Sequence, residues 1–499
     1  MDKHLFRSLF RRRGTCPRRR ILPGLRPLLA GAVAGTLAVA AARAEPATNA
    51  AAGEPISLPR SIELALKQNR DLKVEALSLE SAKLGVADAR AEFAFSLQPA
   101  GEASDSSTVD RRSVGLNATR KTVSGSEVEA GAAASDEDIK DGAETRRAAI
   151  HVGLEQPLLR RAGALVNREP VTAAESRWTA ARRSLELKRT DMVVQVVEAY
   201  QNLSSVERQV EYEERAAERL ERFMRLTQAR ERQGRSTRVD ALRAELKVGE
   251  GRLRLNSGLE GLSSQRAAFA ELLGFPPEQV FTVQVAPDLA VDLPDAPEAV
   301  RLALRNRLDY AQILQDSEDS RRGVAIARRD MLPDLRLSTR YERFGQGPEA
   351  ADMRSLDESV WFVTLKMDSD LPLRKERIAL AQARIGEQTS EVRIEAVRSA
   401  VARQVQQALL AYDRARKQVP VAERNYQLAQ NRARLARRLY ERGKGDNFSV
   451  ADAEDERQNA QEQWIQAQAA ATVEAYRLLR VLGILIEYPA DLMPGKRQS

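Results

Sequence analysis

Three long stretches of this chain carry small or apolar residues at alternating spacings of three and four. One set is Ala241, Ala244, Val248, Gly251, Leu255, Gly258, Leu262 and Phe269. Two others are Val419, Ala422, Tyr426, Ala429, Ala433, Ala436, Tyr440 and Gly443, and Val450, Ala453, Ala460, Trp464, Ala467 and Ala471. This spacing forms one stripe along a helix and is the coiled-coil repeat. It predicts long paired helices at about 172–233, 237–273, 374–442 and 447–482, packed closely because many seam residues are Ala or Gly.

Two other segments, at about 93–156 and 333–371, change to a period of two. Apolar and polar residues alternate from Leu335 to Tyr341 and from Trp361 to Met367, and again around Ile150 to Leu154. Strands of about ten residues with one apolar and one polar face are typical of a membrane β-barrel wall. In the first segment an extra hairpin-like piece, 112–135, leaves open which of its strands enter such a wall.

The two halves of the chain repeat each other. "GVAIARRDMLPDLRL", starting at Gly323, follows a related stretch, "GVADARAEFAFSLQP", which starts 238 residues earlier at Gly85. A second register offset by 209 residues aligns Gly234 with Gly443. Such self-similarity indicates an internal duplication. We therefore expect two structural repeats, 45–290 and 291–485, each with a short helix, a β-segment and two long helices, followed by a C-terminal tail at 486–499.

The positive charge of the chain is concentrated at its start. Residues 1–44 hold ten of the 79 Lys and Arg residues but one of the 71 Asp and Glu residues, so the rest carries 69 basic and 70 acidic residues. The basic start, the apolar run 28–42 and the small-residue site at 42–44 predict a signal peptide at 1–44 and export. A retained membrane anchor is the alternative. Because the basicity belongs to this leader, we expect no nucleic-acid partner.

The side chains that usually carry catalysis or bind metals are scarce beyond the leader. The single cysteine, Cys16, lies within the leader, and His151 is the only histidine after it. No cluster has metal-ligand spacing, and no glycine-rich phosphate loop or serine elbow occurs. We expect no enzyme activity and no cofactor, catalytic or metal site. No later segment is apolar for 18 residues, so we expect any membrane crossing beyond the leader to be made by β-strands.

Several motifs together resemble the TolC-type outer-membrane efflux proteins. They are the duplicated "LALxxxxD…GVAxAR" stretch, the "QPLL" and "LPL" segment ends, the "RQGRSTRVDALRAE" and "RGKGDNFSVADAE" turns and the terminal "LLGF" and "VLGI". The resemblance covers about residues 55–485. It implies a mainly α fold with a membrane β-barrel part, in which duplicated helical hairpins form a periplasmic tunnel. It also implies a homotrimer whose protomers each supply four strands to one 12-stranded barrel in outer-membrane lipid.

The resemblance further implies an exit duct of a tripartite efflux or type I secretion system. Such a duct transports solutes or polypeptide passively and works with a periplasmic adaptor and an inner-membrane pump. Substrate choice is made largely by the pump, so the sequence does not separate efflux from secretion. The alternative function is a periplasmic coiled-coil scaffold without a barrel, for which the apolar alternation from Trp361 to Met367 has no evident use.

The turns between the long helices are the candidate adaptor-docking tips, because the family places them at the periplasmic entrance. The docking candidates are Gln233, Gly234, Arg235, Ser236, Arg442, Gly443, Lys444 and Gly445. A plain helix stop with Gly as the C-terminal cap is the alternative role. The second turn is preceded by Arg432, Arg434, Arg437 and Arg438. These arginines suggest an entrance that favours anions, against the alternative of a solvated outer face.

Overall fold

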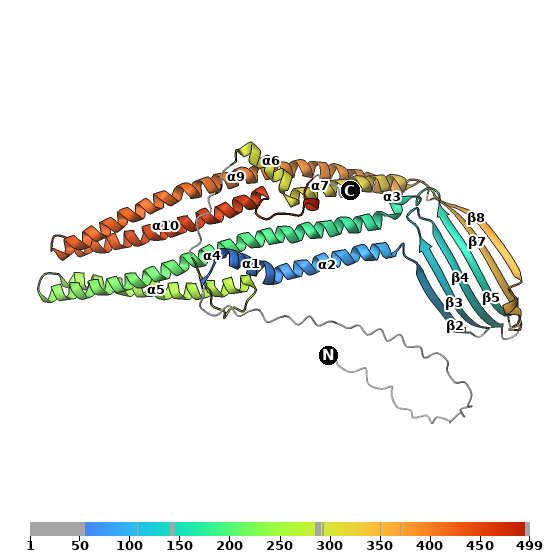
Figure 1. Ribbon diagram of the computed structural model, residues 1–499, viewed down its shortest axis with the longest axis horizontal. Helices are drawn as coiled ribbons and strands as arrows, with labels where there is room; N and C mark the ends of the chain where they lie inside the picture. The colour runs from blue at the N-terminus through green and yellow to red at the C-terminus, as the bar shows by residue number, and fades with distance from the viewer. Residues whose placement is uncertain are drawn as a thin grey trace, which may run out of the picture. The chain divides into compact units, whose positions relative to one another are not determined.

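In the computed structural model, the described residues are 55–106, 108–139, 145–284, 291, 294–349, 351–369 and 371–494 (Figure 1). The predicted signal peptide, 1–44, lies outside them. Long helices and one large sheet make up the described chain, which confirms the prediction of a mainly α fold with a β part. None of the helices in these ranges is long and apolar enough to cross a membrane.

The two halves share an order of two shorter helices, β-strands and two long helices, and differ in the strands β3 and β4 and in the short helices α3 and α8. The first contains α1 (Leu58–Gln68), α2 (Arg70–Ala91), β2 (Ser96–Asp105), β3 (Val109–Lys121), β4 (Glu127–Ile139), β5 (Thr145–Pro157), α3 (Ala164–Asn167), α4 (Glu169–Arg232) and α5 (Arg238–Leu273). The second contains α6 (Ala296–Asn306), α7 (Leu308–Arg329), β7 (Asp334–Gly347), α8 (Asp352–Ser355), β8 (Glu358–Asp368), α9 (Arg374–Glu441) and α10 (Asn447–Leu482). The short strands β1 (Pro55–Ile56) and β6 (Thr282–Val283) pair in parallel.

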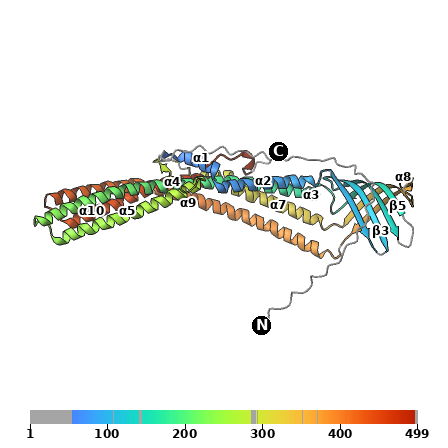
Figure 2. The ribbon, with the colours of Figure 1, turned by 90° about the horizontal axis from the view of Figure 1, so that it is seen from below.

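The helices pack side by side in two rows, one near the hairpin turns and one near the sheet, which we call ranks. Both ranks contain α4 and α9. Near the hairpin turns, the contacts run in the order α9, α10, α4, α5; near the sheet they run α9, α7, α4, α2 (Figures 1 and 2). In both ranks α9 forms one border, and α5 or α2 forms the other. The small seam residues allow this close packing: Ala241, Ala244 and Ala453 are almost completely buried.

The core lies where the short helices cover the long ones. In the first half, Tyr200 of α4 is fully buried beside Phe269 of α5, and its hydroxyl donates to the Ile56 and Gln284 carbonyls at 2.9 and 2.6 Å. Burial raises the pKa of Tyr200 to about 12. In the second half the equivalent core joins α6, α9 and α10 through Ala303, Val405 and Leu478.

Six strands form a single antiparallel sheet in the order β2, β3, β4, β5, β7, β8. This corrects the expected four strands per protomer, because the extra piece 112–135 contributes most of β3 and β4. The apolar side of β4 consists largely of Ala130, Ala132 and Ala134. Alanine gives little contrast to its polar neighbours, so the period-two pattern is weak there.

The two faces of this sheet differ in polarity. The register places twelve large apolar side chains on one face, each 43–72% exposed. They are Leu97, Val114, Leu116, Val128, Ile150, Val152, Leu154, Tyr341, Trp361, Val363, Leu365 and Met367. The other face is charged: His151 lies 2.8 Å from Glu129, and Arg147 donates to Glu342 at 2.5 Å. No described segment covers the first set, which we call the apolar sheet face.

The segment after α10, expected as a C-terminal tail at 486–499, packs against the helices in its described part. Tyr488 and Leu492 are buried against Leu308 at the start of α7. Arg182 of α4 forms an ion pair with Asp491 at 2.6 Å, and Arg183 donates to the Leu492 carbonyl at 3.1 Å. Up to residue 494 this segment is therefore part of the packed helical region.

Candidate functional site

The candidate site is the end of the helices opposite the sheet, where both helical hairpins turn (Figures 1 and 2). The first hairpin is α4 with α5, and the second is α9 with α10. Their turns, 233–237 and 442–446, contain all the residues predicted as docking tips. No described cluster of His, Cys, Asp and Glu could hold a metal ion, here or elsewhere in the described chain.

Both turns are built as helix stops. Gly234 and Gly443 adopt left-handed backbone angles, with φ of 70° and 72°. The following residues, Arg235 and Lys444, donate their backbone N–H groups to carbonyls five residues earlier, at 2.8 and 2.9 Å. This is the Schellman arrangement, in which glycine avoids the steric cost of a Cβ. The glycines therefore have a structural role whether or not the turns dock a partner.

The next helix starts at each turn with a side-chain cap. Thr237 and Asp240 form a capping box at the start of α5, and Asp446 accepts from the Ser449 N–H at 2.8 Å at the start of α10. The side-chain hydrogen bond from Thr237 lowers the pKa of Asp240, and hydrogen bonds from the side chain and the backbone of Ser449 lower the pKa of Asp446. Both turns therefore have defined geometry on both sides, which suits a surface that another protein recognises.

Arg230 joins the tips of the two hairpins. From the end of α4 it donates to the Tyr440 and Glu441 carbonyls of α9 at 2.7 and 2.8 Å. Its guanidinium also lies over the Tyr440 ring, 4.4 Å from the centroid. These carbonyls form the negative end of α9, so a cation is favoured there. The sequence spacing places Tyr440 on a helix seam, but no sequence signal distinguishes Arg230 from its many arginine neighbours.

Replacing Arg230 with Ala is expected to destabilise the C-terminal turn of α9. Two charge-assisted hydrogen bonds disappear, and we expect a local loss of roughly 1–2 kcal/mol. Hydrogen exchange of the 436–446 amides should then become faster by about one order of magnitude. Arg222→Ala is the matched control, since Arg222 lies on the same helix and makes one exposed ion pair with Glu218. Unchanged exchange at 436–446 in the Arg230 variant would contradict the role given to Arg230.

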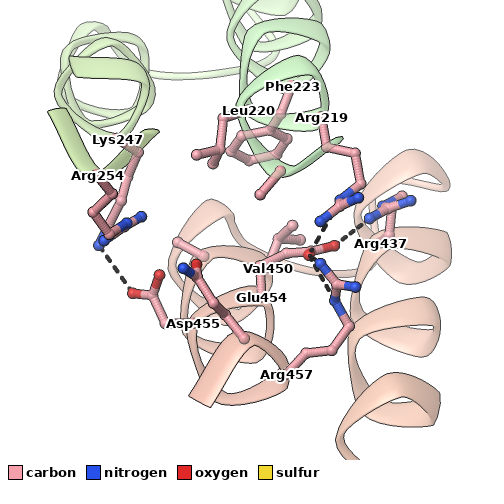
Figure 3. Close-up of a pocket in the computed structure, with 13 residues that line it drawn as sticks. Arg219, Leu220, Phe223, Lys247, Arg254, Arg437, Val450, Glu454, Asp455 and Arg457 are labelled. Carbon is pink, nitrogen blue, oxygen red and sulfur yellow. Dashed lines mark hydrogen bonds and ion pairs between the residues drawn. The ribbon is translucent and has the colours of Figure 1, made fainter. Parts of the chain in front are cut away.

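One carboxylate, Glu454 of α10, holds arginines from three helices (Figure 3). Arg437 of α9 donates to it, Arg457 of α10 lies 2.9 Å away, and Arg219 of α4 lies 3.8 Å away. We call these four residues the Glu454 cluster. Burial lowers the pKa of Arg219, whose Nε and Nη2 atoms have no hydrogen-bond partner among the described residues. The cluster therefore depends on a single negative charge.

A cavity of about 40 Å³ separates the two hairpins beside this cluster (Figure 3). Leu220, Phe223 and Val450 form part of its apolar lining. On its other side Lys247 of α5 forms an ion pair with Asp455 of α10 at 2.9 Å, and this hydrogen bond raises the pKa of Lys247. The hairpins are thus linked by charges on both sides of a small apolar gap.

Further from the tips, a pair of tyrosines adds another link. The hydroxyls of Tyr212 in α4 and Tyr426 in α9 are 2.8 Å apart, and the Tyr426 ring stacks on Trp464. Burial raises the pKa of Tyr426 to about 12. The Tyr426 phenol therefore stays neutral at ordinary pH and keeps its place in this contact.

The four predicted entrance arginines have different surroundings. Arg432 forms ion pairs with Asp452 and Glu456, and Arg437 belongs to the Glu454 cluster. Arg434 donates to the Asn431 side chain, and Arg438 is exposed. At least two of the four charges are therefore compensated by carboxylates of α10. The anion preference stays a prediction, and Arg434 and Arg438 are the two arginines that would carry it.

The same fold occurs in known outer-membrane channels. Residues 299–484 match the model of the outer membrane efflux protein family. The second half of this chain is therefore similar to members of that family. The match runs from α6 to just beyond α10 and so includes the second hairpin and its turn. This confirms the resemblance seen in the sequence to efflux proteins of the outer membrane. A search of curated proteins found no match.

Solved structures extend the likeness to both halves. The outer-membrane channel OprN superimposes with a TM-score of 0.68 at 18% identity, covering 85% of this chain and 89% of its own. VceC from Vibrio cholerae gives 0.67 at 18% identity, covering 85% and 96%. The CmeC channel from Campylobacter jejuni gives 0.69 at 15% identity, covering 87% of each chain. At these identities the structures show that the chain shares the fold of these channels.

Proposed function

We propose that this protein is the homotrimeric outer-membrane exit duct of a tripartite efflux system. The apolar sheet face carries the proposal. A sheet that exposes twelve large apolar side chains on one face and charges on the other matches a wall between lipid and an aqueous lumen. A periplasmic scaffold would leave this apolar area in water, at a cost of roughly 25 cal/mol per Å².

The edges of the sheet support assembly. β2 and β8 each pair on one side only among the described strands. Unpaired backbone groups in lipid cost several kcal/mol each, so such edges must be paired within the membrane. Because an even number of strands alternates in direction, β2 runs opposite to β8. The β8 edge of one protomer can therefore continue, still antiparallel, into the β2 edge of the next.

The borders of the helical ranks support the same assembly. α5 exposes Val239, Leu246 and Leu253, and α9 exposes Ile378, Ile385 and Val392 followed by Val421, Leu428 and Leu435. Members of each set are seven residues apart, which is the spacing of a coiled-coil seam. Since α5 and α9 form opposite borders near the turns, α9 of one protomer can pack on α5 of its neighbour. The number of protomers in the closed ring, three, is taken from the family resemblance.

The assembly of sheets and helices proposed above also suggests where each part of the chain lies in the cell envelope. We propose that the leader directs export, that the sheet lies in the outer membrane and that the hairpins extend into the periplasm. The two turns, 233–236 and 442–445, then face an adaptor that connects to an inner-membrane pump. The family assignment favours efflux of solutes over secretion of polypeptide. We also propose that the two repeats divide near residue 290.

Membrane fractionation and single-channel recording test this function. The full chain should be recovered in the outer membrane, require detergent for extraction and migrate as a trimer. Reconstituted in planar lipid bilayers, it should form pores that conduct ions without added energy. A mature chain that stays soluble without detergent and remains monomeric would instead support the scaffold alternative.

A further inference from the structure

The sheet contains one more hairpin than the family resemblance implies. We infer that β3 and β4 widen the membrane pore, so that three protomers close an 18-stranded barrel in place of a 12-stranded one. This rests on the proposed trimeric duct, since one protomer supplies six strands. It would make the outer-membrane part of the duct suitable for bulkier solutes than a 12-stranded wall admits.

The register shows that β3 and β4 belong to the wall. β3, β4 and β5 each contain 13 residues and pair without interruption. Leu116 pairs with Ala132, which in turn pairs with Ile150. Because directly paired residues point to the same side of a sheet, the apolar face continues through both strands. A hairpin standing outside the wall would not need this matched alternation.

Side-chain packing also fixes the hairpin to β5. At Gly131 of β4 an added Cβ would lie 2.0 Å from Asn117 Oδ1 and 2.5 Å from His151 Cε1. The side chains of β3 and β5 therefore cross over β4 at this glycine. His151 is nearly buried there, with Nε2 2.8 Å from Glu129. This packing on the polar face binds three strands together where the lumen would be.

Because the insert contains an even number of strands, the directions of the other strands are the same with and without it. β2 is antiparallel to β5 in strand direction, because two strands separate them. Following the register across the hairpin aligns Ser96 with Gly153, so the two strands have matching positions. Without the hairpin, β2 and β5 can therefore pair directly. The same protomer is compatible with both a four-stranded and a six-stranded share of the barrel.

The expected consequence is a wider lumen. Barrel diameter increases roughly linearly with strand number, so 18 strands give about 1.5 times the diameter of 12, and roughly twice the cross-section. The insert also contributes small side chains to the polar face, including Ser113, Gly115, Ala133 and Ser135. These reach only a short way into the lumen, so they would not cancel the gain in diameter.

Deletion of residues 109–139 provides the test, because it removes β3, β4 and their turn. Both the full chain and the deletion variant are reconstituted as trimers in planar bilayers, and polyethylene glycols of increasing size are added on the barrel side. The largest polymer that lowers conductance should have a hydrodynamic radius about 1.5 times larger for the full chain. Equal exclusion sizes for the two pores would overturn the inference.

A strand count of the unmodified trimer by electron cryomicroscopy decides the matter even if the deletion variant does not assemble. Eighteen strands in the wall support the inference. Twelve strands, with β3 and β4 outside the wall, overturn it while leaving the proposed duct intact. Failure of the full chain to form any trimeric pore would instead contradict the proposed function itself.

Discussion

A Leu246→Glu, Leu253→Glu double variant should be recovered from detergent as a monomer. These two leucines of α5 are 67% and 72% exposed, so the exchange costs little within one protomer. In the trimer they would be buried against α9 of the next protomer. Each lost leucine removes roughly 1.5–3 kcal/mol of apolar burial, and an unpaired buried carboxylate adds a further penalty. Three symmetric interfaces each contain both changes, so the effect on assembly is large.

Size-exclusion chromatography with light scattering measures this result, together with the temperature at which trimers dissociate. Leu246→Met with Leu253→Met is the matched control, because it preserves apolar surface and should keep the trimer. Leu428→Glu with Leu435→Glu on α9, in the part of that helix near the turns, should reproduce the monomer from the other side of the interface. Glutamate variants that form trimers of unchanged heat stability would exclude these faces from the subunit contact.

The fold could be predicted from the sequence where the apolar period was strong. The 3,4 spacing of Ala244, Val248 and Ala453 indicated long helices, and these side chains lie buried in the helical ranks. The alternation from Trp361 to Met367 indicated β8. The period was weak in β4, because alanines such as Ala132 form its apolar face. There the sequence predicted too few strands, since alanine distinguishes poorly between a wall position and a loop.

The candidate site was predicted less completely. Glycines mark both hairpin turns, because a left-handed helix stop favours glycine at Gly234 and Gly443. The partners of individual arginines are set by contacts between helices that are far apart in sequence. The sequence therefore grouped Arg432 and Arg437 as entrance charges, whereas both are paired with carboxylates of α10. Arg230 and Glu454 had no local signal that distinguished them on such highly charged helices.

Glu454→Gln should weaken the contact between the two hairpins more than any other single loss of charge near the tips. The substitution leaves Arg219, Arg437 and Arg457 close together without the carboxylate that they share. Removing one partner from a buried ion pair costs roughly 3–5 kcal/mol. Because Arg437 is 43% exposed and partly screened by water, we expect about 2–3 kcal/mol.

Thermal unfolding and hydrogen exchange of residues 450–460 measure the change, and exchange there should accelerate strongly. Glu456→Gln is the matched control: Glu456 lies on the same helix but makes an exposed ion pair with Arg432, so the expected loss is about 0–1 kcal/mol. A second substitution, Arg219→Met, should restore part of the stability of the Glu454 variant by removing one uncompensated charge. Equal destabilisation by the two glutamine variants would contradict this account of the cluster. In reconstituted trimers, the weakened contact between hairpins should also raise conductance, because in the proposed duct these hairpins surround the periplasmic entrance.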